Sequence, residues 1–236
     1  RLYIKEYEEE TNLKCTILLD CSKSMRYGEH DTNGLSKFDY GATLAACLAY
    51  LLQKQQDAVG LVTFDREIKM NLPASASPAH VKKLVYELEQ TEPDDRSDVH
   101  DAFHSLAEQI RRRGLVVLIS DLFVDLPALT EALHHFRHRR HEVVVFQLMH
   151  EHEIDFPFQD NTLFKGLEIE QELMTEPRAL RKAYLEAKDR FCDEVRRTCA
   201  TSGIDYVMLS TADPLDAALS SYLAFRQRSA KAARRA

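Results

Sequence analysis

Short hydrophobic runs of strand length alternate with segments of helical periodicity along most of the chain. The runs are rich in Val, Ile and Leu, which is typical of strands that are covered on both faces. They fall at residues 14–19, 59–64, 115–120, 143–149 and 204–209. A shorter strand is predicted at 67–71, paired back onto its predecessor across a turn at Asp65 and Arg66.

Helix start signals lie between these predicted strands. Ser36 and Asp39 have the spacing of a capping box, and apolar residues then share one helical face up to Leu52. Proline in a first helical turn marks other helix starts, because a backbone N–H at that position would have no partner within the helix. Further helices are predicted after Ser77, at 97–113, at 126–140, from Glu176 to near Gly203, and after Asp213.

Strands that alternate with helices predict βαβ crossovers. We therefore expect a Rossmann-like α/β fold, with a doubly wound, mostly parallel sheet flanked by helices, in a single domain over residues 1–236. Residues 153–175 lack helical periodicity and predict a small β-ribbon insert, and residues 226–236 form a basic tail. The sequence begins inside a strand-like segment at Arg1, which predicts that the natural N-terminus lies further upstream.

Composition narrows the classes of function. The 38 acidic residues outnumber the 31 basic ones and give a net charge of −7, which argues against a nucleic-acid-binding face. The five cysteines form no C-x-x-C pair, so we expect a reducing, cytoplasmic setting. The apolar run at 44–52 is too short to cross a bilayer, so no membrane span is predicted.

Oxygen-bearing side chains alternate where the first long hydrophobic run ends, in ILLDCSKSM. Asp20, Ser22 and Ser24 are separated by single residues, and Asp121 closes a later run, LVVLISD. Ligands of doubly wound sheets bind beyond the carboxyl ends of the strands, where the strand order reverses. A set made only of carboxylates and hydroxyls suits a hard divalent cation, so we expect Mg²⁺ or Mn²⁺, weakly bound, at this rim.

The chain resembles a known family at these motifs. D-x-S-x-S after a strand, a later hydroxyl loop and a strand-ending Asp look like the metal-ion-dependent adhesion site (MIDAS) of von Willebrand factor A domains. The segments EYEEETNLKCTILLDCSKSM, KFDYGATLAACLAYLLQKQQDAVGLVTFD and VVLISDLFVD are similar to the bacterial family catalogued as domain of unknown function 58. This likeness covers nearly the whole chain.

The resemblance implies a ligand set and a function. Asp20, Ser22 and Ser24 match the first motif, Asp121 matches the third, and Ser97 stands where the second motif normally has Thr. Lys23 and Arg96 lie next to ligands in sequence, and a cation that pointed inward would oppose the metal. The implied function is a non-enzymatic protein-interaction module whose metal binds an acidic residue of a partner. MoxR-type AAA+ ATPases are the partner class that the family implies.

Three other interpretations remain open. A phosphohydrolase of the haloacid dehalogenase type would use Asp20 as nucleophile, although Ser22 stands where its general acid is expected. A scaffold with a vestigial rim would bind no metal. A zinc site has less support, because no cysteine pair or third histidine joins its candidate ligands. Those candidates are His100 with His104, the histidines within 134–141, and His150 with His152, which would end a strand.

Overall fold

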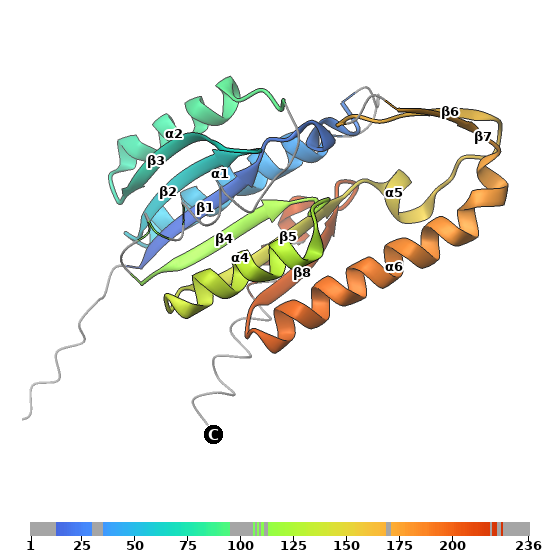
Figure 1. Cartoon of the computed structure of the whole chain (residues 1–236). Coiled ribbons are helices and arrows are strands. Elements are labelled where there is room, and N and C mark those ends of the chain that lie inside the picture. The colour runs from blue at the N-terminus through green and yellow to red at the C-terminus, as the bar shows by residue number, and fades with distance from the viewer. Residues whose placement is uncertain are drawn as a thin grey trace, which may run out of the picture.

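The computed structural model of the chain describes residues 13–29, 35–94, 106, 108, 110, 113–168, 171–217, 219–220 and 223 (Figure 1). Its centre is a six-stranded sheet with the order β3-β2-β1-β4-β5-β8. The strands are β1 (Lys14–Asp20), β2 (Ala58–Phe64), β3 (Ile68–Ser75), β4 (Leu115–Ser120), β5 (Glu142–Met149) and β8 (Asp205–Ser210). Only the pair formed by β2 and β3 is antiparallel in this sheet. The predicted Rossmann-like, mostly parallel α/β fold is confirmed.

Helices cover both faces of the sheet (Figure 1). Ile17 and Leu19 of β1 pack with α1 (Lys37–Lys54) and α2 (Pro78–Gln90), whereas Leu18 packs with α4 (Leu126–His138) and α6 (Pro177–Thr201). This division follows from the strand period of two, which sends successive side chains to opposite faces. The predicted helix at 97–113 and the strand-like segment at Arg1 fall outside the described residues, apart from a few isolated positions in the former.

The strand order reverses between β1 and β4. From β1 the chain proceeds to β2 on one side, whereas from β4 it proceeds to β5 on the other. The last pair in register between them is Leu19 with Ile119, so Asp20 and Ser120 follow at the carboxyl ends of the two strands. At such a point the two crossover connections run over opposite faces of the sheet, which leaves a crevice beyond the carboxyl ends of the strands. Ligands of this fold class bind in that crevice.

α1 lies close against the sheet. Ser36 caps its start, as predicted, with Ser36 Oγ accepting a hydrogen bond from the Asp39 N–H at 3.0 Å. One turn into the helix, a Cβ added to Gly41 would come within 3.0 Å of a Leu148 side-chain atom and 3.1 Å of one from Leu19. The absence of this methyl group lets the first turn of α1 approach the ends of β1 and β4.

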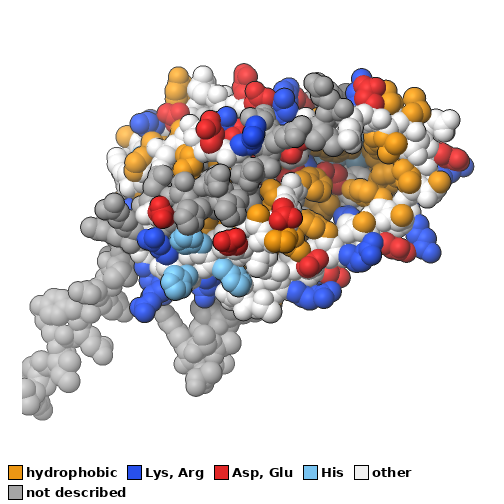
Figure 2. Space-filling view, viewed as in Figure 1, with side chains coloured by type: hydrophobic (Ala, Val, Ile, Leu, Met, Phe, Trp, Pro, Cys, Tyr) orange, Lys and Arg blue, Asp and Glu red, His pale blue; other side chains and the backbone are white. Residues whose placement is uncertain are grey.

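Residues beyond β5 form a short helix and a separate two-stranded sheet. These elements are α5 (Glu151–Asp155), β6 (Thr162–Lys165) and β7 (Glu172–Thr175), the last two pairing antiparallel. Phe164 of β6 packs on Phe156 and Phe158, with ring centroids 5.8 and 5.2 Å apart, and Phe156 packs on Tyr184 of α6 at 4.7 Å. Hydrophobic side chains gather on the surface at this end of the molecule (Figure 2).

Candidate functional site

β1 ends in Asp20, whose side chain is fully buried. Asp20 Oδ1 accepts a hydrogen bond from the backbone N–H of Ser22 at 2.9 Å, and Oδ2 accepts one from the Ser120 hydroxyl at 2.6 Å. Aspartate is suited to this position because its side chain can bond the backbone two residues later. These two bonds fix the carboxylate in the crevice between β1 and β4.

The chain after Asp20 turns through a short 3₁₀ helix, η1 (Lys23–Arg26). Ser22 and Ser24 are both buried, and their Oγ atoms lie 3.1 Å apart. The turn is closed by a hydrogen bond from the Met25 N–H to the Ser22 carbonyl at 3.1 Å. The structure therefore brings the two predicted hydroxyls together beside Asp20.

Asp121 follows β4 and is also buried. Burial, and then the charge of Asp121, raise the pKa of Asp20 to about 7, although hydrogen bonds from Ser120 and Ser22 lower it. A neighbouring negative charge disfavours the ionised form of a buried carboxylate such as Asp20, and a nearby cation reverses this effect. A cation beside Asp20 would therefore stabilise its ionised form.

Lys37 belongs to the site, although no local sequence pattern marked it. It is the first residue of α1, its side chain is fully buried, and its Nζ donates to Asp121 Oδ2 at 2.7 Å and to Glu153 Oε1 at 2.9 Å. Burial lowers the pKa of Lys37, but the two carboxylates together raise it more, so the pKa lies above its ordinary value. Lys37 is therefore a permanent ammonium ion inside the site.

One oxygen spacing among the predicted ligands is compatible with Mg²⁺ or Mn²⁺. Adjacent ligands of an octahedral ion with bonds of about 2.0–2.1 Å lie about 3 Å apart, which is close to the 3.1 Å between the oxygens of Ser22 and Ser24. Among the described residues, no group of three or more His, Cys, Asp or Glu side chains is placed to hold a metal, so the hydroxyls are essential to this set. Ser97 lies outside the described residues, and its role stays a prediction.

The buried cation of the site is not one of those that lie next to the predicted ligands in sequence. Lys23 lies 3.3 Å from Asp94 in an ion pair at the surface, with 43% of its side chain exposed. Arg96 lies outside the described residues. Among the described residues, Lys37 instead supplies the inward charge, and its bond to Asp121 opposes a metal.

The interpretation of His150 and His152 as the end of a strand is wrong. β5 ends at Met149, and His150 is the N-cap of α5, with its Nδ1 accepting from the His152 N–H at 3.2 Å. Glu153 completes this cap, because its Oε2 accepts from the His150 N–H at 2.8 Å. Of the histidines within 134–141, His134 and His138 are exposed, whereas His141 is buried. His100 and His104 lie outside the described residues.

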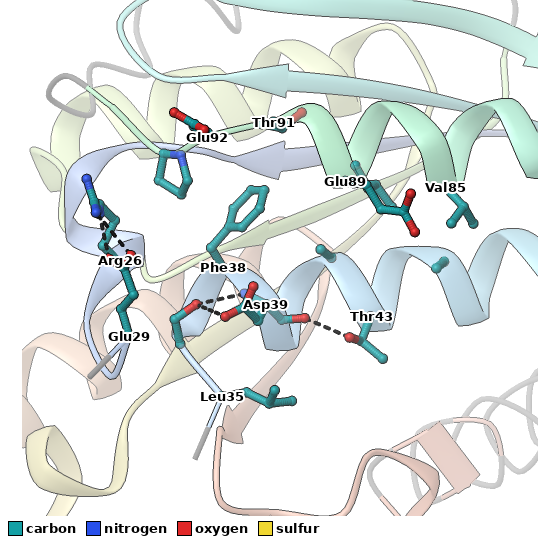
Figure 3. A pocket seen from close by; sticks show the side chains of 15 residues that line it. Arg26, Glu29, Leu35, Phe38, Asp39, Thr43, Val85, Glu89, Thr91 and Glu92 are labelled. Carbon is teal, nitrogen blue, oxygen red and sulfur yellow. Dashed lines mark hydrogen bonds and ion pairs between the residues drawn. The ribbon is translucent and has the colours of Figure 1, made fainter. Parts of the chain in front are cut away.

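Two surface hollows lie next to η1. One, of about 710 Å³, runs between α1 and α2 (Figure 3), with Phe38 in its wall and acidic side chains that include Asp39, Glu89 and Glu92. The other, of about 550 Å³, lies between η1 and the β6–β7 ribbon and is lined by Lys23 and Lys165 among others. The second hollow places the ribbon at the border of the crevice.

Across the described part of the chain, no helix has the length and hydropathy needed to cross a membrane.

The chain is similar to uncharacterised mycobacterial proteins and shares its fold with several solved structures. Proteins Rv1480 of Mycobacterium tuberculosis and Mb1516 of Mycobacterium bovis are each 23% identical over 239 residues, which covers 98% of this chain and 72% of theirs. BatB from Bacteroides thetaiotaomicron has a TM-score of 0.58 at 15% identity, covering 94% of this chain and 99% of its own. An aerotolerance-related membrane protein from Bacteroides fragilis has a TM-score of 0.56 at 16% identity, covering 89% and 96%.

A model of one protein family matches residues 1–192, which is most of the chain. That match includes all five predicted ligands together with Lys37 and Glu153. The chain therefore belongs to the family described as protein of unknown function DUF58.

Proposed function

We propose that the chain is a non-enzymatic, metal-dependent protein-interaction module of the von Willebrand factor A type with a MIDAS-like site. The observation that carries this proposal is the pair of buried hydroxyls of Ser22 and Ser24, 3.1 Å apart, beside Asp20 at the point where the strand order reverses. Mg²⁺ or Mn²⁺ would bind Ser22, Ser24 and Ser97 directly and would reach Asp20 and Asp121 mostly through water. When bound, the ion supplies a coordination position for a carboxylate of the partner.

The residues of the chain orient the donors. Ser120 and the backbone of Ser22 hold the Asp20 carboxylate, and the turn at η1 holds the two serine hydroxyls side by side. Ligand charge tunes the affinity of such sites, and hydroxyls contribute none. This donor set supports weak binding by the module alone and stronger binding when a partner adds a negative charge.

Calorimetric titration with Mg²⁺ and Mn²⁺ tests the site. We expect Ser24→Ala to abolish the binding heat, because it removes a direct ligand without removing a charge. Thr63→Val is the matched control, since it removes another buried hydroxyl that is not among the predicted ligands. Equal affinities in Ser24→Ala and the unsubstituted chain would contradict the proposal. Absence of binding by the unsubstituted chain would favour the scaffold with a vestigial site.

We infer that the partner is a MoxR-type AAA+ ATPase and that the complex forms in the cytoplasm. The partner class rests on the family resemblance, and the setting is supported by five cysteines that form no disulfide. Purified ATPase and purified chain should bind in Mg²⁺, dissociate in EDTA, and fail to bind when the chain carries Ser24→Ala. Binding that persists in EDTA would contradict a metal-bridged contact.

The haloacid-dehalogenase-like phosphohydrolase is the second candidate, and Lys37 is the observation that favours it. This ammonium group lies beside Asp121, where such an enzyme needs a cation. Against it, Asp20 is fully buried and both of its oxygens accept hydrogen bonds, which leaves the nucleophile inaccessible. Hydrolysis of p-nitrophenyl phosphate that is lost in Asp20→Asn would establish the enzyme and overturn the interaction module.

A further inference from the structure

Lys37 occupies a closed pocket for its ammonium group. Its Nζ bonds Asp121 at 2.7 Å and Glu153 at 2.9 Å, and it lies 4.8 Å from the ring centroid of Phe123 and 5.8 Å from that of Tyr27. Aromatic faces attract cations, so the two rings complete a shell of anionic and π partners. These partners together hold the buried ammonium group in one position.

Each of the two carboxylates is also bonded by a backbone N–H. Glu153 Oε2 accepts from the His150 N–H at 2.8 Å, and the Glu153 carbonyl accepts from the Tyr184 hydroxyl at 3.1 Å, which ties it to α5 and α6. The Asp121 carboxylate likewise accepts from the Phe123 N–H at 3.2 Å, and the Asp121 carbonyl accepts from Gln147 Nε2 at 3.2 Å. Lys37 therefore bridges two carboxylates that are each anchored by a backbone N–H, with the shorter of these bonds on Glu153.

We propose, on the basis of the proposed function, that Lys37 competes with the divalent cation for Asp121. The ammonium neutralises a carboxylate that the metal needs and adds a positive charge beside the ion, so the module alone binds metal weakly. Glu153 retains Lys37 in its pocket when Asp121 turns toward the metal. The carboxylate of the partner then supplies the missing negative charge, so that metal and partner bind together.

Binding of Mn²⁺, followed by electron paramagnetic resonance of the free ion, tests this competition in two variants with opposite expected signs. In the double variant Lys37→Met with Glu153→Gln, the net charge is unchanged and Asp121 is released. We expect this variant to bind Mn²⁺ tighter, on the order of tenfold, as is typical when groups that contact metal ligands change. Glu153→Gln alone leaves Lys37 with Asp121 as its one anionic partner, so we expect a loss of affinity.

A second ion pair provides the matched control. Lys23→Met with Asp94→Asn also conserves net charge next to the site, but it removes a surface pair, so the affinity for Mn²⁺ should stay within about twofold of the unsubstituted chain. Melting curves followed by circular dichroism, with and without Mn²⁺, establish that each variant is folded. Glu153→Gln keeps an acceptor for the His150 N–H and therefore keeps the cap of α5.

Equal or weaker Mn²⁺ binding by the folded double variant would overturn the competition and leave the metal site standing. If the double variant does not fold, Glu153→Gln decides the question, and unchanged or tighter binding in that variant would overturn the competition. Absence of Mn²⁺ binding in every folded protein, the unsubstituted chain included, would overturn both the competition and the metal-dependent function.

Discussion

The ends of β1 and β2 lie side by side and carry the same aspartate turn, but the two aspartates differ in the group that contacts their second carboxylate oxygen. Asp65, after β2, accepts from the Glu67 N–H at 3.1 Å, just as Asp20 accepts from the Ser22 N–H at 2.9 Å. Asp65 Oδ2 then lies 3.0 Å from the ammonium of Lys69, whereas the second oxygen of Asp20 faces only a hydroxyl. Asp121, on the other side of Asp20, also has a lysine.

Asp20 therefore lies between two strand-end aspartates that are each paired with a lysine. Within the described residues, no Lys, Arg or His forms an ion pair with Asp20, and its pKa is raised. The turn that positions a strand-end aspartate is thus independent of the group that neutralises it. The aspartate without an internal cation is the one that a metal from solution would neutralise.

Removal of the buried cation should have the largest effect. Lys37→Met leaves Asp121 and Glu153 as uncompensated buried carboxylates, and breaking a buried pair in this way destabilises by about 3–5 kcal/mol. Urea unfolding of the purified chain in EDTA measures the loss. An effect below about 1 kcal/mol would show that water or another group replaces the ammonium.

The pH dependence of stability should change when Asp20 is replaced. Its folded pKa of about 7 lies above the ordinary value of 3.8, so the folded state binds this proton more tightly than the unfolded state. The contribution of this proton to the unfolding free energy is fully present below about pH 4 and is lost as the pH rises through about 7. Relative to the unsubstituted chain in EDTA, Asp20→Asn should gain roughly 2–3 kcal/mol in unfolding free energy between pH 5 and pH 8. A pH-independent difference between the two proteins would contradict this.

Ser120→Ala should have an intermediate effect. It removes the hydroxyl that donates to Asp20 Oδ2 at 2.6 Å and accepts from the Leu122 N–H at 2.9 Å, so we expect a loss of about 1–3 kcal/mol in unfolding free energy. Because the Ser120 bond lowers the pKa of Asp20, its loss should also move the pH transition of stability upward. Thr63→Val, near the end of β2, serves as the control and should change stability little.

Lys69→Met should have the smallest effect, although it also removes a lysine from a strand-end aspartate. Lys69 is 40% exposed, and partly exposed ion pairs contribute at most about 1 kcal/mol. Urea unfolding of Lys69→Met and Lys37→Met under the same conditions compares their losses in unfolding free energy. Equal losses in the two variants would show that burial of the cation is not what distinguishes the two regions.

Much of the fold could be predicted because its signals are local. Strand runs, the cap at Ser36 and the proline-marked helix starts each lie within a few residues. Asp20, Ser22 and Ser24 were predictable as neighbours because they follow one strand. The position of Asp121 followed from the rule that parallel strands end at the same edge.

The remaining features depend on contacts between distant segments. The partners of Lys37 lie 84 and 116 residues away, and a lysine at the first position of a helix normally extends into solvent. Ser120 reads as part of a strand, yet its hydroxyl bonds a residue 100 positions earlier. The sequence does not predict α5, because this helix is five residues long and depends on Glu153 to complete its cap.

Gly41 gives a way to move the ammonium without changing any charged group. It lies one turn after Lys37 on α1, where a methyl group would press on the side chains of Leu19 and Leu148. Gly41→Ala would therefore act as a wedge that lifts the start of α1 from the sheet and lengthens the reach from Lys37 to Asp121. The distance between the ammonium and its carboxylate is in this sense set by a packing residue, so the metal affinity that we propose for the site should change with a substitution that alters no charge.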